Sequence, residues 1–577
     1  MTPTDATDFT ALPPYRPRQF IPGGVDLTDL ATVTGLYQAL LDRPATSAEA
    51  LEGWLLARSE LDAAVDQARS ILYIRMTCQT DDPARAEAYR RFIETVEPAI
   101  ASLGDKLDRK YLEARRSSGS DLGRYGVYER NVRADVELFR QENVPLRTEE
   151  SLLSQKYQAI TGDMMVEFEG RQRTMPEMRK FLLEPDRSRR EAAWRAAARR
   201  RLADRDRLDD LFERMLGLRT RIAANAGCRD FVEYQFRACR RFDYAPADCR
   251  RYHEAVARSV VPLWRDILED RRRRLGVDCL RPWDTSVDPD GRPPLKPFER
   301  PEELAARAIE VFRRTDPALG EQFAAMDRQG LLDLASRKGK APGGYQAGLS
   351  EARRPFIFMN AVGVDDDVWT LLHEGGHAFH AVATVDEPLL AYRGAPTEFS
   401  EVASMGMELL AVEHTGVFYG PEDLKRSRRQ HLEGVGRNLP WVATIDAFQH
   451  WIYTHPGHSR SQRQEAWADV FGRFGGGVVD WTGLEEERAS SWHQQLHIFE
   501  YPFYYIEYGI AQLGALGLWM LARKDPRAAL AGYRRALALG GSRPLPELFA
   551  AAGLKFDFSE ATIAPLARLA ADALARL

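Results

Sequence analysis

The chain has 577 residues, 44% of them hydrophobic and 29% charged, which is enough for more than one globular lobe. No apolar run is long enough to span a bilayer, and 85 acidic against 80 basic residues give a formal net charge of −5. The arginines alternate with acidic residues at helical spacing, which is typical of a solvated helix face. These features argue against a membrane protein and against a nucleic-acid partner.

The cysteines and the start of the chain indicate a cytoplasmic location. Five cysteines occur without a C-x-x-C pair, which favours reduced thiols over disulfides or a zinc ribbon. The first twenty residues have neither a basic start nor an apolar core, so no secretory signal is expected.

Helix formers dominate the first part of the chain. The first 23 residues carry several prolines and glycines and predict an extended lead-in, whereas helices are expected from about Asp26 to Arg240. Breaks in this pattern fall near residues 117–126 and at Pro185.

The second part begins with a loop and a short strand. Residues 280–299 are rich in proline and aspartate, and Pro355–Asn360 is a β-like run with aromatic side chains at alternating positions. A helix is expected around residue 373, a second begins at Pro396-Thr397, and the remainder is helical to the end. The predicted fold class is therefore mainly α, with a small β-sheet beside the helix around residue 373.

The most informative motif is H-E-x-x-H, at His373-Glu374-Gly375-Gly376-His377. Two histidines four residues apart on a helix project to the same side, so both imidazoles can reach one metal ion. Glu374 falls beside them, where it can take a proton from a water on the metal. This arrangement is typical of zinc hydrolases. Three aspartates at 365–367 add the negative charge that a helix N-terminus favours.

A third metal ligand is expected, because a catalytic zinc usually has three protein ligands. Position 383 is alanine, which excludes the metzincin pattern with a third histidine there. His380 lies about a turn beyond His377 and is interpreted as a packed or supporting histidine. Glu398, Glu401 and Glu408 share one face of the next helix, and spacing alone leaves Glu398 and Glu401 open as the ligand.

The segment DVWTLLHEGGHAFH, followed after a loop by TEFSEVASMGMELL, resembles the oligoendopeptidase F and thimet oligopeptidase family of zinc metallopeptidases. The similarity covers broadly Pro185 to Gly541 and is greatest to the bacterial oligoendopeptidase F branch. In that family the third ligand is the glutamate of an F-x-E-x-x-S phrase, and FSEVAS matches it, so the resemblance implies Glu401. It also implies Glu374 as the base and one zinc per chain. Eleven histidines are present and all but His253 lie between His373 and His497, and no second His/Cys cluster is evident.

The segment HIFEYPFYYIEYGIAQLGAL resembles the family's C-terminal catalytic segment. The resemblance implies that His497, Tyr508 and Tyr505 stabilise the transition state, with Tyr504 the alternative if the register slips by one. A phenol or imidazole near the scissile carbonyl can stabilise the oxyanion. The alternative interpretation is an aromatic core. The run RPFIFMN resembles the family's edge strand beside the metal, to which a peptide could add as a strand, or it is simply a buried strand.

The resemblance implies a zinc-dependent oligoendopeptidase that hydrolyses internal bonds of short peptides. It also implies two helical lobes around a deep substrate channel, with an N-terminal helical domain at residues 1–184 and a catalytic domain at residues 185–577. Two alternatives stay open. One is a metallocarboxypeptidase that uses the same site, and the other is a non-catalytic zinc-containing protein that binds peptides. Glu374 argues against the second alternative, because an inert site has no use for a base.

Overall fold

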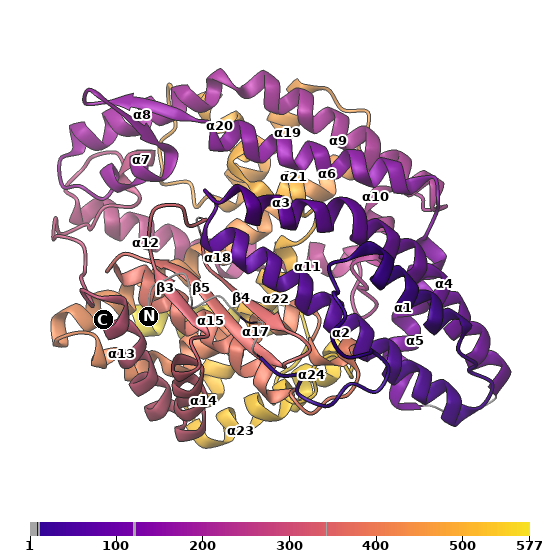
Figure 1. Ribbon diagram of the computed structural model, residues 1–577. Helices are drawn as coiled ribbons and strands as arrows, with labels where there is room; N and C mark the ends of the chain where they lie inside the picture. The colour runs from indigo at the N-terminus through magenta and orange to yellow at the C-terminus, as the bar shows by residue number, and fades with distance from the viewer. Residues whose placement is uncertain (1–8, 10–11, 119–122, 342) are drawn as a thin grey trace. The chain divides into compact units, whose positions relative to one another are not determined.

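The computed structural model describes residues 9, 12–118, 123–341 and 343–577, and the chain divides into two compact units. Unit 1 comprises residues 1–137, 296–425 and 514–556, and unit 2 comprises residues 138–295, 426–513 and 557–577. Both units draw on distant parts of the chain, whereas the division at residues 184/185 stays a prediction, as does the channel. The predicted mainly α fold with a small sheet is confirmed (Figure 1).

Unit 1 contains two groups of helices and the larger sheet. Its helices are α1 (Leu30–Asp42), α2 (Ala48–Cys78), α3 (Pro83–Arg91), α4 (Glu97–Ser118), α5 (Gly126–Leu138), α13 (Pro301–Thr315), α14 (Pro317–Arg328), α15 (Asp365–Ala383), α16 (Leu390–Arg393), α17 (Thr397–Ala411), α23 (Pro526–Leu537) and α24 (Leu545–Ala551). A π-helical turn at Phe92–Val96 joins α3 to α4. Its strands are β3 (Leu332–Ala335), β4 (Tyr345–Leu349) and β5 (Arg354–Ala361).

Unit 2 is almost entirely helical. Its helices are α6 (Asn143–Gly162), α7 (Met175–Phe181), α8 (Arg187–Ala203), α9 (Arg205–Asn225), α10 (Phe231–Ala238), α11 (Pro246–Ser259), α12 (Val261–Arg274), α19 (Arg460–Phe474), α20 (Glu485–Ala489), α21 (Leu496–Glu500) and α25 (Glu560–Leu574). Most of α18 (Pro421–Thr454) and the first half of α22 (Tyr505–Ala522) also belong to it.

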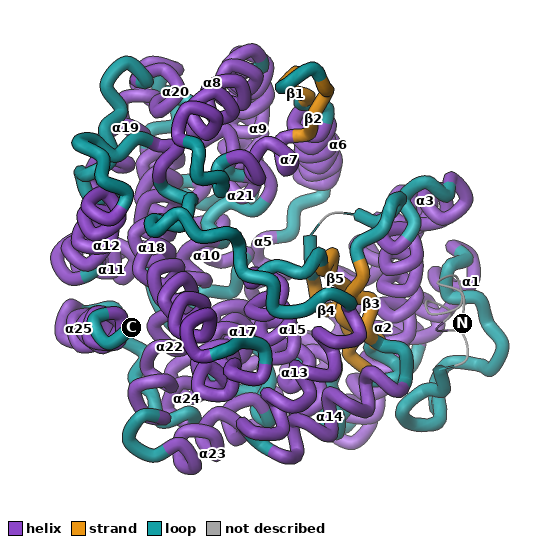
Figure 2. Tube along the Cα trace, turned by 90° about the vertical axis from the view of Figure 1, so that its left-hand side faces the viewer, coloured by secondary structure: helices purple, strands orange, loops and turns teal. Residues whose placement is uncertain are grey.

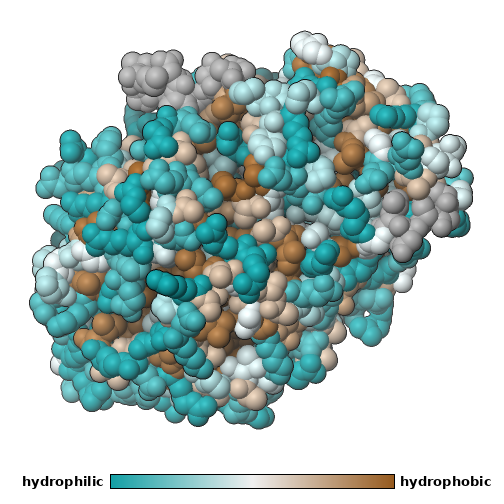
Figure 3. All heavy atoms as spheres, turned by 90° about the horizontal axis from the view of Figure 1, so that it is seen from below, coloured by the Kyte–Doolittle hydropathy of each residue, from teal (hydrophilic) through white to brown (hydrophobic). Residues whose placement is uncertain are grey.

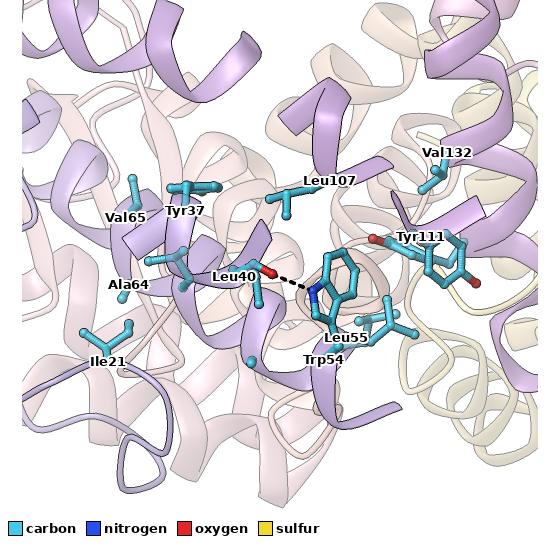
Figure 4. Packing of buried hydrophobic residues seen from close by; sticks show 14 of the residues in the cluster. Ile21, Tyr37, Leu40, Trp54, Leu55, Ala64, Val65, Leu107, Tyr111 and Val132 are labelled. Carbon is cyan, nitrogen blue, oxygen red and sulfur yellow. Dashed lines mark hydrogen bonds between the residues drawn. The ribbon is translucent and has the colours of Figure 1, made fainter. Parts of the chain in front are cut away.

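The N-terminal helices of unit 1 have their own apolar core. Trp54, Leu55 and Leu107 are fully buried there, with Tyr111 beside them (Figure 4). The Trp54 indole N–H donates a hydrogen bond of 2.9 Å to the Leu40 carbonyl, so the polar atom of this large side chain is satisfied inside the core. This packing ties α2 to α1.

The three-stranded sheet has the order β3-β5-β4 (Figure 1). β5 pairs in parallel with β3 and antiparallel with β4, so the run RPFIFMN is a central strand and the prediction of an edge strand is wrong. The apolar side chains of β5 are buried, as expected for a strand covered on both faces. Within the described chain, β4 and β3 form the two edges.

A β-hairpin in unit 2 interrupts the helices predicted between Asp26 and Arg240. Strands β1 (Met165–Phe168) and β2 (Arg171–Thr174) pair antiparallel and are joined by two residues (Figure 2). Both of these residues have positive φ, 53° at Glu169 and 71° at Gly170, as a type I′ turn requires. The hairpin was not predicted because glutamate rarely occupies the first position of such a turn.

The surface agrees with the composition. On the face seen in Figure 3, polar and charged side chains predominate, with small groups of apolar atoms between them. None of the helices in the described residues combines the length and the apolar character needed to cross a bilayer.

Candidate metal centre

Helix α15 carries the H-E-x-x-H motif, and its start is fixed by the predicted acidic residues. The Asp367 carboxylate accepts hydrogen bonds from the backbone N–H groups of Val362, Gly363 and Val364, at 2.9, 2.9 and 3.0 Å. This third residue of the helix thus reaches back to the N-cap Val364 and the two residues before it, and its charge interacts favourably with the helix dipole. These hydrogen bonds therefore fix where the helix that carries the motif begins.

The two glycines inside the motif let α15 approach its neighbours. A Cβ at Gly376 would lie 2.4 Å from the Ala403 carbonyl oxygen on α17, and a Cβ at Gly375 would lie 2.5 Å from the Phe312 ring on α13. A larger residue at position 376 would push the backbone of α17 away, and one at position 375 would displace the Phe312 ring. The Tyr533 hydroxyl donates to the same Ala403 carbonyl at 2.7 Å, which holds α17 in place. Close contact between α15 and α17 then brings their polar side chains together.

Three of the predicted ligands converge between α15 and α17. Ligand atoms of His373, His377 and Glu401 all lie within 4.8 Å of one another. The Nε2 atoms of His373 and His377 lie 3.4 and 3.7 Å from the same Glu401 oxygen, Oε2. The Ser404 hydroxyl donates to that oxygen at 3.0 Å and orients the carboxylate. Glu398 is buried on α17 and lies outside this group among the described residues.

Glu408 orients the first histidine. Its Oε1 lies 2.7 Å from His373 Nδ1, which leaves Nε2 directed at Glu401 and available to a metal. Histidine ligands commonly use their second nitrogen in this way. Glu408 lies on the glutamate face that the sequence analysis noted, but no role was predicted for it. The signal was its spacing of seven residues from Glu401.

The surroundings shift the pKa values of these groups in different directions. Burial raises the pKa of Glu374 to about 7 and lowers the pKa of His377 to about 4. Burial also lowers the pKa of His373, but its hydrogen bonds to Glu401 and Glu408 outweigh this, so that pKa is well above the usual value. A bound cation would oppose the rise in the pKa of His373, because a metal ligand must be a neutral imidazole.

Glu374 lies next to the edge of the sheet. The backbone of Gln346 on β4 lies close enough to the Glu374 carboxylate to lower its pKa slightly against the effect of burial, so β4 is the strand beside the predicted base. His380, at the far end of α15, is fully enclosed, and its Nε2 has no hydrogen-bond partner among the residues that the structure covers. It belongs to the packed interior rather than to the ligand group.

The predicted oxyanion-stabilising residues belong to unit 2, whereas the ligand group belongs to unit 1. His497 on α21 packs against three tyrosines, with ring centroids 4.9 Å from Tyr505, 5.6 Å from Tyr504 and 6.0 Å from Tyr508. Burial lowers the pKa of His497 to about 4 and raises that of Tyr505. The imidazole is therefore neutral and the Tyr505 phenol protonated near neutral pH. The structure brings these four together but does not choose among the tyrosines.

A fixed turn precedes the tyrosines. Phe503 has a φ of 66°, in the left-handed region that a side chain of this size rarely adopts. Its N–H donates to Gln449 Oε1 at 2.7 Å and its carbonyl accepts from Arg241 at 2.6 Å. These two hydrogen bonds hold the conformation and so set where α22 and its tyrosines begin.

Comparison with known proteins shows to which family the chain belongs. Residues 181–567 match Peptidase family M3, and residues 25–120 match the Peptidase M3 N-terminal domain. The chain belongs to peptidase family M3. The predicted family is thereby confirmed.

Individual proteins that resemble this chain agree with this assignment. Oligopeptidase PepF of Bacillus subtilis is 27% identical over 254 residues, covering 42% of this chain and 37% of PepF. An oligoendopeptidase F homolog of Borreliella burgdorferi is 23% identical, covering 50% of this chain and 49% of the relative. These matches thus span less than half of each relative. The solved structure of PZ peptidase A with an inhibitor superposes with a TM-score of 0.88 at 26% identity, covering 97% of this chain and 99% of that one.

The donors of this M3 chain suit zinc. Two imidazoles and one carboxylate are the ligand types that zinc accepts in hydrolytic sites, with one position left for water. The side chains of His373 and His377 are 24% and 19% exposed, so the ligand group is open to solvent on one side. A closed structural site would not leave its ligands accessible in this way.

Proposed function

We propose that this chain is a zinc-dependent oligoendopeptidase that hydrolyses internal bonds of short peptides. The observation that carries the proposal is the convergence of His373, His377 and Glu401 within 4.8 Å, next to the buried carboxylate of Glu374. Membership of peptidase family M3 supports peptide hydrolysis as the reaction. The sequence has no apolar run long enough to span a bilayer, and its five cysteines favour reduced thiols. Both features support a cytoplasmic location.

The reaction assigns a separate task to each side chain. His373, His377 and Glu401 would hold one zinc ion, which when bound supplies Lewis-acid chemistry, polarising a carbonyl and acidifying a water. Glu374 takes the proton from the attacking water and passes it to the leaving amine as the peptide bond breaks. Glu408 keeps His373 in the orientation that presents Nε2.

Residues of unit 2 are the proposed stabilisers of the transition state. His497 and Tyr508, with Tyr505 as a second phenol, would donate hydrogen bonds to the carbonyl oxygen as it gains negative charge. Their roles come from the family resemblance. The neutral state of the His497 imidazole supports a role as a hydrogen-bond donor rather than a fixed cation.

The peptide would bind along β4. This strand has one edge free of strand partners within the described chain, and its Gln346 lies near enough to the proposed base to influence the pKa of that carboxyl. A peptide that adds to a strand edge is held mainly through its backbone, which would give broad sequence tolerance.

Digestion of a defined peptide set tests this function. The set contains peptides of graded length, each with a free and an amidated C-terminus, and the products are mapped by mass spectrometry. Cleavage at internal bonds of both forms, abolished by a chelator and restored by zinc, is expected. Removal of single residues from the free form alone would indicate a carboxypeptidase, and no cleavage would contradict the proposal.

A further inference from the structure

A second group of metal-ligand side chains lies inside unit 2, between α11 and α18. Cys249 and His253 are four residues apart on α11, and Asp446 and His450 are four apart on α18. Residues at this spacing share one helix face. Ligand atoms of Cys249, Asp446 and His450 all lie within 4.8 Å of one another. His253 Nε2 lies 2.8 Å from Asp446 Oδ2.

The group is enclosed, yet two of its polar atoms are unsatisfied. Asp446 is 0% exposed, Cys249 1%, His253 4% and His450 9%. In the part of the chain that the structure describes, Asp446 Oδ1 and His450 Nε2 have no hydrogen-bond partner. His450 Nε2 is 3.4 Å from Asp446 Oδ2 but does not hydrogen-bond it. Buried polar atoms almost always have hydrogen-bond partners or metal ligation. The direct interpretation is therefore that Asp446 Oδ1 and His450 Nε2 share a bound partner.

We propose that Cys249, Asp446 and His450 bind a second divalent metal ion, for which zinc is the best match. A thiolate, a carboxylate and an imidazole suit zinc, whereas calcium and magnesium prefer oxygen ligands alone. The thiolate and carboxylate together carry two negative charges, which offset a divalent cation and make its burial tolerable. His253 fixes the carboxylate through Nε2, as partners of metal ligands commonly do.

Neighbouring charges are compatible with a cation here. Arg241, the cation that lowers the pKa of Cys249 against the effect of burial, is paired with Glu507 at 2.7 Å. Arg473, which lowers the pKa of His253 together with burial, is paired with Glu254 at 2.7 Å. Binding would release the Cys249 proton, since the thiolate is the ligand.

An ion pair alone does not account for the arrangement. An ion pair between Asp446 and its two histidines would explain the position of His253. It would leave Asp446 Oδ1 without a hydrogen-bond partner among the described residues and would give Cys249 no role. Aromatic rings also pack against the two histidines. Phe503 lies 5.0 Å from His450 and Phe474 lies 6.3 Å from His253, measured between ring centroids. Among the residues that the structure describes, no further buried carboxylate stands beside these ligands as Glu374 does in unit 1, so the proposed ion would join α11 to α18 and stabilise unit 2.

Metal counting tests this site separately from the proposed catalytic one. The full-length protein, saturated with zinc and then dialysed, should retain two zinc ions per chain, against the one expected from sequence. Cys249→Ser should retain one and Glu401→Ala should retain one, each losing a different ion. Cys228→Ser is the matched control, since Cys228 is also a buried cysteine of unit 2, and it should retain two. Equal zinc content in Cys249→Ser and Cys228→Ser would overturn the second site.

Cobalt replaces zinc in a second measurement that needs no change at Cys249. In a variant with Cys78, Cys228, Cys239 and Cys279 changed to serine, Cys249 is the remaining thiol. Cobalt binding should produce a near-ultraviolet sulfur-to-cobalt charge-transfer band, which the His/His/Glu ligands of unit 1 cannot give. The band should persist when Glu401→Ala is added. A folded protein that binds cobalt without this band would overturn the proposal, whatever its peptidase activity.

Discussion

Two helix pairs of this chain present metal-ligand side chains at the same spacing but in opposite surroundings. In unit 1, His373 and His377 are partly exposed and the carboxylate of Glu374, the proposed base, follows the first of them. In unit 2, the Cys249/His253 and Asp446/His450 pairs are enclosed and no such base is present among the described residues. Four-residue spacing brings ligands together in both. In our proposals, solvent access and the neighbouring carboxylate distinguish the site for chemistry from the site for stability.

The largest effect is expected from removing the ligand that joins α15 to α17. Glu401→Ala should lose the zinc of unit 1 and with it all measurable peptidase activity, because two imidazoles alone hold the ion weakly. Glu398→Ala is the matched control on the same helix, and it should retain the zinc of unit 1 and the peptidase activity. Zinc content by elemental analysis distinguishes them, and loss of zinc in Glu398→Ala instead would make Glu398 the ligand.

A smaller effect is expected in the aromatic group of unit 2. Tyr508→Phe should lower kcat by about 10²–10³ with little change in KM, since an oxyanion donor acts mainly in the transition state. His497→Ala should behave similarly. Phenylalanine keeps the ring, so zinc content and thermal stability should be unchanged in steady-state and unfolding assays. A normal kcat in Tyr508→Phe with a loss in Tyr505→Phe or Tyr504→Phe would move the role to that tyrosine.

The smallest effect is expected at Glu408, which contacts His373 and not the substrate. Glu408→Ala should weaken zinc binding or activity by about 10–100-fold, the usual result of removing a residue that orients a ligand. Glu408→Gln should recover part of this, because its amide oxygen can still accept from Nδ1. Zinc affinity measured by competition with a chelator gives the readout. Equal affinity in all three proteins would show that His373 needs no such support.

Local features could be predicted from the sequence, and features that depend on distant parts of the chain could not. The H-E-x-x-H helix and its acidic start rest on neighbouring residues, and both were predicted correctly. The prediction that β5 is an edge strand was wrong, because the order of strands depends on β3 and β4 and not on the sequence of β5 itself. The residues of the second metal group were missed because His253 and Asp446 are 193 positions apart.

The choice between Glu398 and Glu401 is one that helix periodicity alone cannot make. Both share a helix face, so periodicity left them equal, and only the family phrase favoured Glu401. In the structure, Gly376 packs against Ala403 and Ser404, and this contact places Glu401 rather than Glu398 close to the two histidines. That contact joins two helices and has no signature in either one alone.

Glu374→Gln tests the central claim most directly. The substitution keeps the size of the side chain and all three ligands but removes the base, so zinc content should stay unchanged while kcat for peptide hydrolysis falls by about 10²–10⁴. Elemental analysis and turnover of an internally quenched peptide are measured on the same sample. Full zinc with near-normal turnover would contradict the account, because Glu374 would then not be the base.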